Sequence, residues 1–221
     1  MKDVTKFFES SMTRRTYKKR SIVLYQGEVP RHVYVVLKGV IKVYALTNAG
    51  EEQVVALLTK NDIFSLPWLF GSTNHALYYH EALTDCVLSC VDKEVFMSTM
   101  QKNQELQTTM LSSLARLYSG SLVHITALEQ SRAREKVLTV LYYLCLGNGT
   151  EFKPGKYKIT LHLTHSIIAS LCGLTRETAA LELSKLKKSG VVKYTARYYL
   201  IDKAGIEKLL GEDNFANVKL Q

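Results

Sequence analysis

Short apolar runs alternate with turn residues between positions 20 and 92 of the chain. The runs are rich in Val, Ile, Leu and Tyr, and they are interrupted at Gly27-Glu28, Lys38-Gly39, Asn48-Ala49-Gly50 and Lys60-Asn61-Asp62. Short strands at nearly even spacing predict an antiparallel barrel or jelly roll. The segment NAGEE predicts one of its hairpins, because glycine adopts a positive φ at little steric cost.

The pattern becomes helical after Asp92. The segment KEVFMSTMQKN predicts a short helix, and the segment from Glu105 to about Gln130 predicts a long one, since it holds no proline and a single glycine. Along the long helix, apolar or small residues recur in steps of four and three, the spacing of a coiled-coil seam. We assign to this seam Leu106, Met110, Leu114, Leu117, Ser121, His124 and Leu128.

A second apolar track widens the face of this helix, and it consists of Leu111, Tyr118, Leu122 and Ile125. So much apolar surface predicts two partners for one helix, its own barrel and the same helix of a second copy. Burial of the whole helix within a monomer is the alternative. Because polar seam positions often set register, Ser121 and His124 are expected to tune how the paired helices pack.

The last third of the chain has the pattern of a winged helix-turn-helix. Residues 131–146 predict a helix that ends at Gly147-Asn148-Gly149, and residues 156–163 predict a strand. Two short helices follow, and the segment VVKYTARYYLID predicts a hairpin that turns near Thr195-Ala196. The order helix, strand, helix, turn, helix, hairpin matches that motif.

Capping residues frame the two short helices. Thr164 and Thr175 can each cap a helix through the side-chain oxygen, and Gly173 supplies a left-handed turn between them. In a helix-turn-helix, the first turn of the second helix meets base edges of DNA. Arg176 can donate two bonds to guanine there, and Glu177 can accept from the cytosine amino group. Phosphate contacts are expected from Thr164, His165, Ser166, Thr175, Thr178, Lys185, Lys188 and Arg197.

The charge distribution favours a polyanion as partner. The net charge is +9, and residues 131–221 carry 15 Lys and Arg against 8 Asp and Glu, whereas residues 1–130 carry 14 against 12. Double-stranded DNA fits this basic excess, and a merely solvated surface is the alternative. No apolar run reaches the roughly 18 residues of a membrane span, and the N-terminus lacks the apolar core of a secretory signal. We expect a cytoplasmic protein.

The remaining chemistry of the sequence is sparse. The four cysteines, at positions 86, 90, 145 and 172, form no CxxC pair and match no metal framework. We expect small buried side chains, with a redox pair of Cys86 and Cys90 as the alternative. No nucleophile–base pair, metal-ligand spacing or phosphate loop stands out, so we expect neither an enzyme nor a metal site.

From end to end, the chain resembles the Crp/Fnr family of bacterial transcription regulators. The segment YQGEVPRHVYVVLKGVIKVY resembles the family's cyclic-nucleotide-binding-like fold, and LTHSIIASLCGLTRETAALELSKLKKSGVV resembles its DNA-binding signature. The resemblance implies an α+β fold with a sensory jelly-roll barrel at 1–104, a dimerisation helix at 105–130 and a winged helix-turn-helix at 131–221. It also implies a homodimer that reads two-fold related half-sites, with RNA polymerase as a candidate further partner.

The sequence departs from the family pattern at two sites. On the second helix, Leu181 stands where members usually carry an arginine, and Ala180 where some carry a base-reading serine. In the barrel, Leu66 replaces the glutamate that binds ribose in cyclic AMP-binding members, and the phosphate arginine falls near Ala76. A cyclic phosphate would lack its bidentate clamp, so cyclic AMP is not expected.

No cofactor is expected. The N-terminal cysteine cluster of the iron–sulfur branch is absent, and His32, His75 and His80, the candidate haem ligands, are expected to be surface or core residues. An effector pocket for a small organic molecule is one interpretation of the barrel, and an interior filled by the same side chains is the other. The candidate pocket residues are Leu66, Trp68, Phe70, His75, Tyr78 and Tyr79.

These observations favour a dimeric, DNA-binding transcription regulator with a sensory barrel. Two rivals stay open. One is a DNA binder that needs no effector. The other is a signalling module that binds a protein or small molecule and no longer reads DNA. Ala180 and Leu181 support this rival, whereas the basic excess and the intact helix-turn-helix are against it.

Overall fold

The computed structural model describes residues 3–195 and 197–211. It divides into two compact units, Met1–Leu114 and Ala115–Gln221. The division falls inside α3 (Gln104–Glu129), so this helix contributes residues to both units. The first two and last ten residues of the expected domains lie outside the described residues, and so does Ala196 of the expected hairpin turn.

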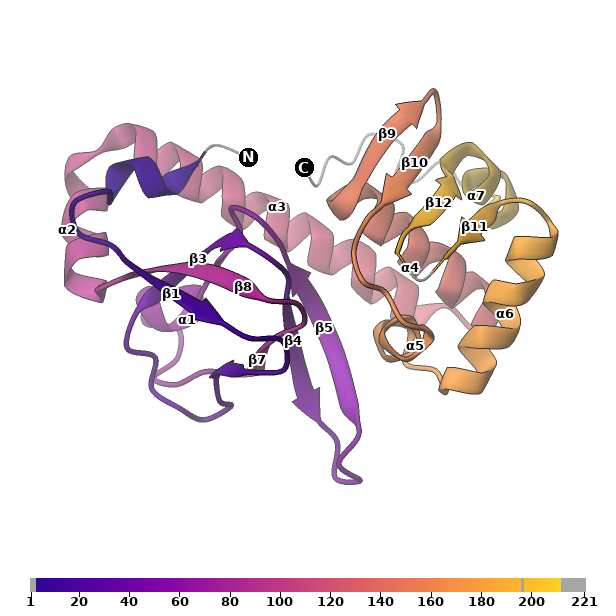
Figure 1. Cartoon of the computed structure of the whole chain (residues 1–221), viewed down its shortest axis with the longest axis horizontal. Coiled ribbons are helices and arrows are strands. Elements are labelled where there is room, and N and C mark those ends of the chain that lie inside the picture. The colour runs from indigo at the N-terminus through magenta and orange to yellow at the C-terminus, as the bar shows by residue number, and fades with distance from the viewer. Residues whose placement is uncertain (1–2, 196, 212–221) are drawn as a thin grey trace. The chain divides into compact units, whose positions relative to one another are not determined.

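The first unit is an antiparallel barrel of two four-stranded sheets (Figure 1). One sheet has the order β1, β8, β3, β6, with bounds Thr13–Tyr17, Cys86–Val91, Val33–Lys38 and Ile63–Phe64. The other has the order β2, β7, β4, β5, with bounds Ile22–Leu24, Tyr79–Ala82, Ile41–Leu46 and Glu52–Leu58. The α+β fold class, with its β-rich N-terminal domain, is confirmed.

Alternating side chains fill the space between the two sheets. Strand residues point to opposite faces in turn, and the inward set includes Val36, Ile41, Val43, Leu58, Ala82 and Leu88. Three rings stack through this core, because Phe64 lies 4.8 Å from Tyr34 on one side and 4.8 Å from His80 on the other, measured between ring centroids.

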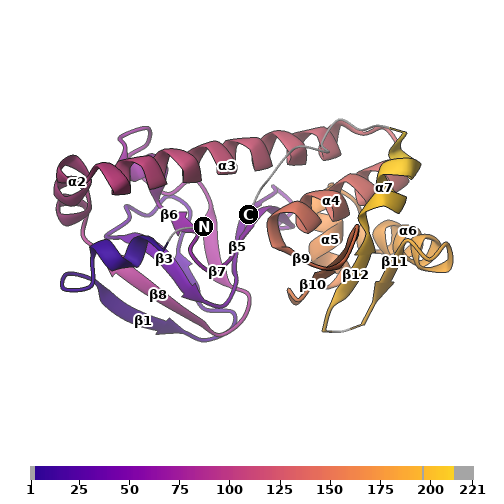
Figure 2. The same ribbon diagram turned by 90° about the horizontal axis from the view of Figure 1, so that it is seen from above.

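Short helices close the first unit. A 3₁₀ helix spans Val4–Phe7, α1 spans Leu66–Leu69, and α2 spans Lys93–Lys102 and leads into α3 (Figure 2). The short helix predicted after Asp92 is therefore confirmed as α2. Phe8 stacks on Phe96 of α2 at 4.8 Å between ring centroids, which holds the residue after the 3₁₀ helix against α2.

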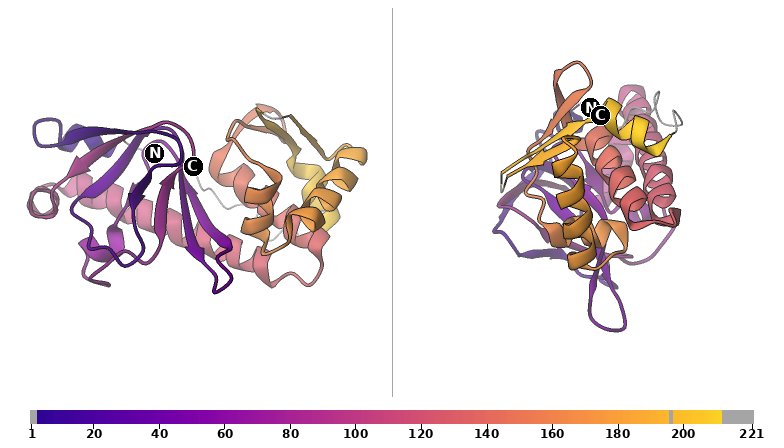
Figure 3. Two further views of the ribbon diagram at one scale, coloured as in Figure 1. Left: turned by 60° about the horizontal axis from the view of Figure 1, so that its bottom comes forward. Right: turned by 90° about the vertical axis from the view of Figure 1, so that its right-hand side faces the viewer.

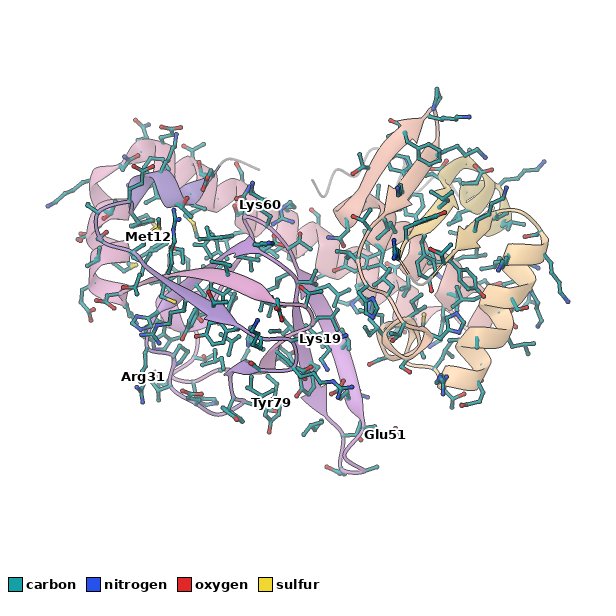
Figure 4. All side chains as sticks on the ribbon, viewed as in Figure 1. Met12, Lys19, Arg31, Glu51, Lys60 and Tyr79 are labelled. Atoms are coloured by element: carbon teal, nitrogen blue, oxygen red, sulfur yellow. The ribbon has the colours of Figure 1, made fainter. Side chains whose placement is uncertain are left out.

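The hairpin predicted from NAGEE joins β4 to β5 and is confirmed. The backbone N–H of Thr47 donates to the carbonyl of Glu51, and Gly50 adopts a φ of +79°. Figures 1 and 3 show the hairpin extending past the other strands, and Figure 4 labels Glu51 near its tip.

The turn between β3 and β4 packs so closely against the start of β8 that only glycine fits at position 39. Gly39 has a φ of +93°, and a Cβ there would lie 2.5 Å from the Cys86 sulfur and 2.6 Å from the Asp85 carbonyl oxygen. Gly27 has a similar φ of +83° with nothing within 4 Å. We expect Gly27→Ala to cost about 1–2 kcal/mol of unfolding free energy from backbone strain alone. Gly39→Ala should cost at least about 3 kcal/mol, because contact strain is added.

Urea unfolding of both variants beside the wild type measures the two costs. Equal losses at Gly39 and Gly27 would contradict the close approach of this turn to β8.

The second unit is a winged helix-turn-helix, as predicted. Its helices are α4 (Ala133–Asn148), α5 (His165–Cys172), α6 (Arg176–Lys188) and α7 (Lys203–Leu210). Its sheet has the order β11, β12, β10, β9, with bounds Val192–Tyr194, Tyr199–Asp202, Lys156–Ile159 and Gly149–Lys153. The sequence did not predict β9 or α7. Helix α4 extends to Asn148, beyond its predicted end, and β9 starts at the next residue.

The core of the second unit lies between α4 and the helix-turn-helix. Buried apolar side chains from α4, α5, α6 and the sheet meet there, namely Val137, Leu141, Leu144, Ile168, Leu171, Leu183, Leu186, Val192, Tyr199 and Ile201. Among all the described residues, no helix is both long and apolar enough to cross a membrane.

Candidate nucleic-acid interface

Helix α5 has the start and end that its sequence predicts. The Thr164 hydroxyl oxygen accepts a hydrogen bond from the Ile167 backbone N–H at 3.2 Å, which caps the first turn. Gly173 ends the helix with a φ of +60°, and its N–H donates to the carbonyls of Ala169 and Ser170. The chain can turn sharply here because glycine tolerates the left-handed backbone conformation.

Helix α6 also begins at a threonine cap, as its sequence predicts. The Thr175 hydroxyl oxygen accepts from the Thr178 backbone N–H at 3.3 Å, and the two threonine hydroxyls lie 2.9 Å apart. Glu177 in the first turn and three lysines in the last turn both complement the helix dipole. The caps and charges together fix where α6 begins and which end is basic.

Packing against the core decides which face of α6 is free. Ala179, Leu183 and Leu186 are buried, and α5 packs beside them. Figure 1 shows α6 along one edge of the second unit. Arg176 and Glu177 are both exposed at its N-terminal end, where a helix-turn-helix presents side chains to base edges.

The predicted phosphate ligands lie on three elements of the same unit. Thr164, Ser166 and Thr175 are exposed, while His165 and Thr178 are half-buried. The His165 ring meets the Tyr194 ring edge-on at 5.3 Å, which orients it between α5 and the wing.

The basic side chains of α6 and the wing differ in their exposure and in their contacts with neighbouring side chains. Lys188 on α6 and Arg197 in the wing turn are exposed. The Lys185 ammonium lies 2.6 Å from a carboxylate oxygen of Glu182, so part of its charge is already compensated within the helix. Lys187 lies over the Tyr194 ring at 4.8 Å, a contact between α6 and β11 that the sequence did not reveal.

The predicted coiled-coil seam on α3 is wrong for three of its seven members. Leu106 and Met110 are fully buried in the first unit, and His124 is buried in the second. Side chains packed inside their own unit cannot meet a second chain. Leu114 and Leu117 are half-buried, and only Ser121 and Leu128 are exposed.

The second apolar track of α3 is the exposed one. Leu111, Tyr118, Leu122 and Ile125 keep between 47% and 67% of their surface. Leu111, Tyr118 and Ile125 are seven residues apart in sequence, so they share one side of the helix. We call these four residues the α3 stripe. Isolated exposed apolar residues are ordinary, but a continuous row of four is typical of an interaction surface.

His124 has a structural position that differs from the predicted one. Its Nε2 lies 2.8 Å from the carbonyl oxygen of Leu171, near the end of α5. Its ring stacks on Tyr143 of α4 at 5.2 Å between centroids, with 9° between the planes. A Cβ at Gly173 would lie 3.6 Å from Leu128, one turn further along α3. The end of α3 therefore contacts the turn of the helix-turn-helix directly.

The six side chains of the predicted effector pocket do not face one space. Leu66 is buried, but Trp68 lies beside α2, with the Lys93 ammonium 4.7 Å from its ring. Phe70, His75 and Tyr78 are exposed. Tyr79 points to the outer face, where it stacks on Tyr44 at 5.2 Å (Figure 4). Strand alternation explains the error, since the inward residue of β7 is the next one, His80.

The barrel interior is apolar at the positions that matter for a cyclic nucleotide. Leu66 and Ala76, which the family resemblance places at the ribose and phosphate, are both buried. Neither can pair with a ribose hydroxyl or a phosphate anion, so these residues do not fit that ligand. Two polar groups are also buried there. Burial lowers the pKa of His80 to about 4, and the Ser65 hydroxyl has no hydrogen-bond partner among the described residues.

All four cysteines are buried. Burial raises the pKa of the Cys90 thiol to about 11 and that of Cys145 and Cys172 to about 12. High pKa values keep thiols protonated and slow to react, which favours a packing role. Within the described residues, no three His, Cys, Asp or Glu side chains form a group that could hold a metal ion.

Two family models match the chain in sequence order. Residues 14–103 match the cyclic nucleotide-binding domain, and residues 135–209 match the Crp-like helix-turn-helix domain. The global nitrogen regulator of Nostoc sp. is 29% identical over 178 residues, which cover 80% of this chain and 79% of that protein. The nitrogen fixation regulation protein FixK of Azorhizobium caulinodans is 26% identical over 200 residues, covering 89% and 79%.

A solved structure of FixK2 from Bradyrhizobium japonicum shares the fold. It superimposes with a TM-score of 0.76 at 22% identity, covering 90% of this chain and 96% of that one. The paired domains, and relatives that are Crp/Fnr-type regulators with a DNA-binding helix-turn-helix, lead to one assignment. The chain belongs to the Crp/Fnr family of transcription regulators.

Proposed function

We propose that two copies of this chain bind DNA half-sites related by a two-fold axis and control transcription there. The observation that carries the proposal is the exposed N-terminal turn of α6, where Arg176 and Glu177 follow the Thr175 cap. Arg176 would donate to guanine, and Glu177 would accept from cytosine. Thr164, Ser166, Lys188 and Arg197 would hold phosphates. RNA polymerase is the further partner that activation would require.

The α3 stripe supports a dimer. Members of the family typically dimerise, and Leu111, Tyr118, Leu122 and Ile125 offer the exposed apolar surface that a second copy would cover. A dimer presents two α6 helices, so half-sites about one turn of DNA apart would be read together. The protein would act in the cytoplasm, with its DNA, and it would not be an enzyme.

We propose a small organic effector other than cyclic AMP, and no metal or haem cofactor. Apolar Leu66 and Ala76 favour a ligand other than a cyclic phosphate. Such a ligand would shift the population between two arrangements of the paired α3 helices. Titration of metabolites against operator affinity separates this regulator from one that needs no effector.

If Arg176 contacts a base, its replacement should change which operator sequence the protein prefers. Purified protein should select a two-fold symmetric motif from random genomic fragments. Arg176→Ala should lose the preference for one base pair in each half-site and bind the motif about tenfold more weakly per half-site, within the 1–3 kcal/mol of a bidentate contact. Selection at two salt concentrations, followed by binding assays, measures both effects.

Lys188→Ala is the matched control. It should weaken binding to all sequences alike and lower the salt dependence by about one counterion per half-site. Weak binding that depends steeply on salt, with no preferred motif, would mean that the basic side chains bind DNA phosphates without reading the sequence. Function would then lie in the barrel, as in a signalling module.

A further inference from the structure

An exposed leucine lies at the centre of the free face of α6. Residues 177, 181, 184 and 188 follow one another at helical spacing on the side opposite buried Ala179, Leu183 and Leu186. Three of the four are polar, namely Glu177, Ser184 and Lys188. The fourth, Leu181, keeps 57% of its surface exposed.

Leu181 is not part of the buried core of its own unit. The core-facing row of α6 is complete without it, and the residues one turn away beside it are polar, namely Glu177, Thr178, Ser184 and Lys185. Leu181 is therefore the apolar member of an otherwise polar face. A single exposed leucine is common on protein surfaces, so exposure alone indicates no function. The informative feature is that Leu181 lies one helical turn after Glu177, which is expected to contact a base.

Only one feature of the major groove suits this side chain. Leucine has no donor or acceptor for a base edge, and the C5-methyl group of thymine is the apolar group that the groove presents. Four residues advance a helix by about 6 Å, which corresponds to about two base-pair steps of 3.4 Å. Leu181 thus reaches a base pair within about two steps of the one that Glu177 reads.

We infer that Leu181 reads the methyl group of a thymine in each half-site, within about two base pairs of the one contacted by Glu177. This inference rests on the proposed DNA-binding function. It adds an apolar specificity contact to the polar contacts of Arg176 and Glu177. The preferred operator then contains a T·A pair where a donor side chain at position 181 would select guanine.

Deoxyuridine tests the inference, because it pairs as thymine does but lacks the methyl group. Each thymine within two base pairs of the Glu177-contacted position is replaced in turn in the selected operator. We expect one position at which the replacement weakens wild-type binding about fourfold per half-site, and about fifteenfold when both half-sites are changed. Leu181→Ala should bind thymine and uracil operators equally at that position.

Two further variants sharpen the test. Ser184→Ala, one turn away on the same face, should keep the preference for thymine over uracil. Leu181→Arg should shift the preferred base at this position to guanine by about tenfold.

The outcomes separate this inference from the proposed function. A specific operator without any uracil effect, or an effect that persists in Leu181→Ala, overturns the thymine contact alone. A protein that selects no operator overturns both proposals.

Discussion

Glutamates at Tyr118 and Ile125 are expected to leave the protein monomeric and to weaken operator binding by at least about 100-fold. Both side chains lie in the α3 stripe, with 66% and 53% of their surface exposed. Covering each by a partner stabilises a dimer by about 1.5–3 kcal/mol, and two copies double the effect. The glutamates remove that contribution and set like charges against one another. A monomer holds one half-site only, so it loses the joint contribution of the second.

Sedimentation velocity and an operator-binding assay measure the two effects. The control is Thr108→Glu with Ser112→Glu, which adds the same charge at exposed positions of α3 outside the stripe. The control should stay dimeric. Both pairs should keep the wild-type circular dichroism, because none of these side chains is buried. A stripe variant that remains a dimer at micromolar concentration would rule out this surface as the interface.

Local signals in the sequence predicted the parts of the fold that local chemistry decides. Thr164 and Thr175 were identified as caps from their type and position, and both accept the expected backbone hydrogen bonds. The hairpin at NAGEE followed from its glycine. A cap or a tight turn involves a few neighbouring residues, so its signal survives without knowledge of the tertiary structure.

The same local signals do not predict the two polar elements at the edge of the second unit, β9 and α7. Strand β9, with the sequence GTEFK, is mostly exposed and has no apolar alternation that would reveal a strand. Helix α7 buries only Ile206 fully. Its cap, Asp202, accepts from the Gly205 backbone N–H, but an aspartate at the end of a strand is not distinctive by itself. Pairing and docking to the rest of the unit decide both elements.

The error on α3 has a different cause. Both sides of the helix are rich in apolar residues, so the spacing of fours and threes fits more than one line along it. The predicted seam runs roughly a quarter of a turn away from the α3 stripe, between the buried and exposed faces. Periodicity shows that a helix is apolar, but only packing shows which apolar row is already covered.

His124 lies against the helix-turn-helix and not in the predicted coiled-coil seam. Its replacement by leucine should destabilise the packing of α3 against α5. The change removes the hydrogen bond to the Leu171 carbonyl and the ring stack on Tyr143. A lost buried hydrogen bond that leaves its acceptor unpaired costs about 1–3 kcal/mol. The aromatic pair adds about 0.5–1.5 kcal/mol. We therefore expect the unfolding free energy to fall by about 2–4 kcal/mol.

Hydrogen exchange can localise this loss. Because His124 joins α3 to the last turn of α5, the amides of α5 and of the Gly173 turn should exchange faster in His124→Leu, and operator affinity should fall about tenfold. His124→Gln can still donate to the Leu171 carbonyl and should recover part of both effects. Ser121→Ala changes an exposed residue of α3 whose hydroxyl bonds only to the Leu117 carbonyl, and should change neither.

If His124→Leu lowers stability but leaves α5 exchange and operator affinity at wild-type values, then His124 stabilises the unit without positioning α6. If all three readouts change together, the contact between α3 and the helix-turn-helix is the physical link through which a change in the paired helices would reach the DNA. The hydrogen bond between the His124 imidazole and the Leu171 carbonyl is part of that link, so single substitutions at position 124 can weaken and partly restore it.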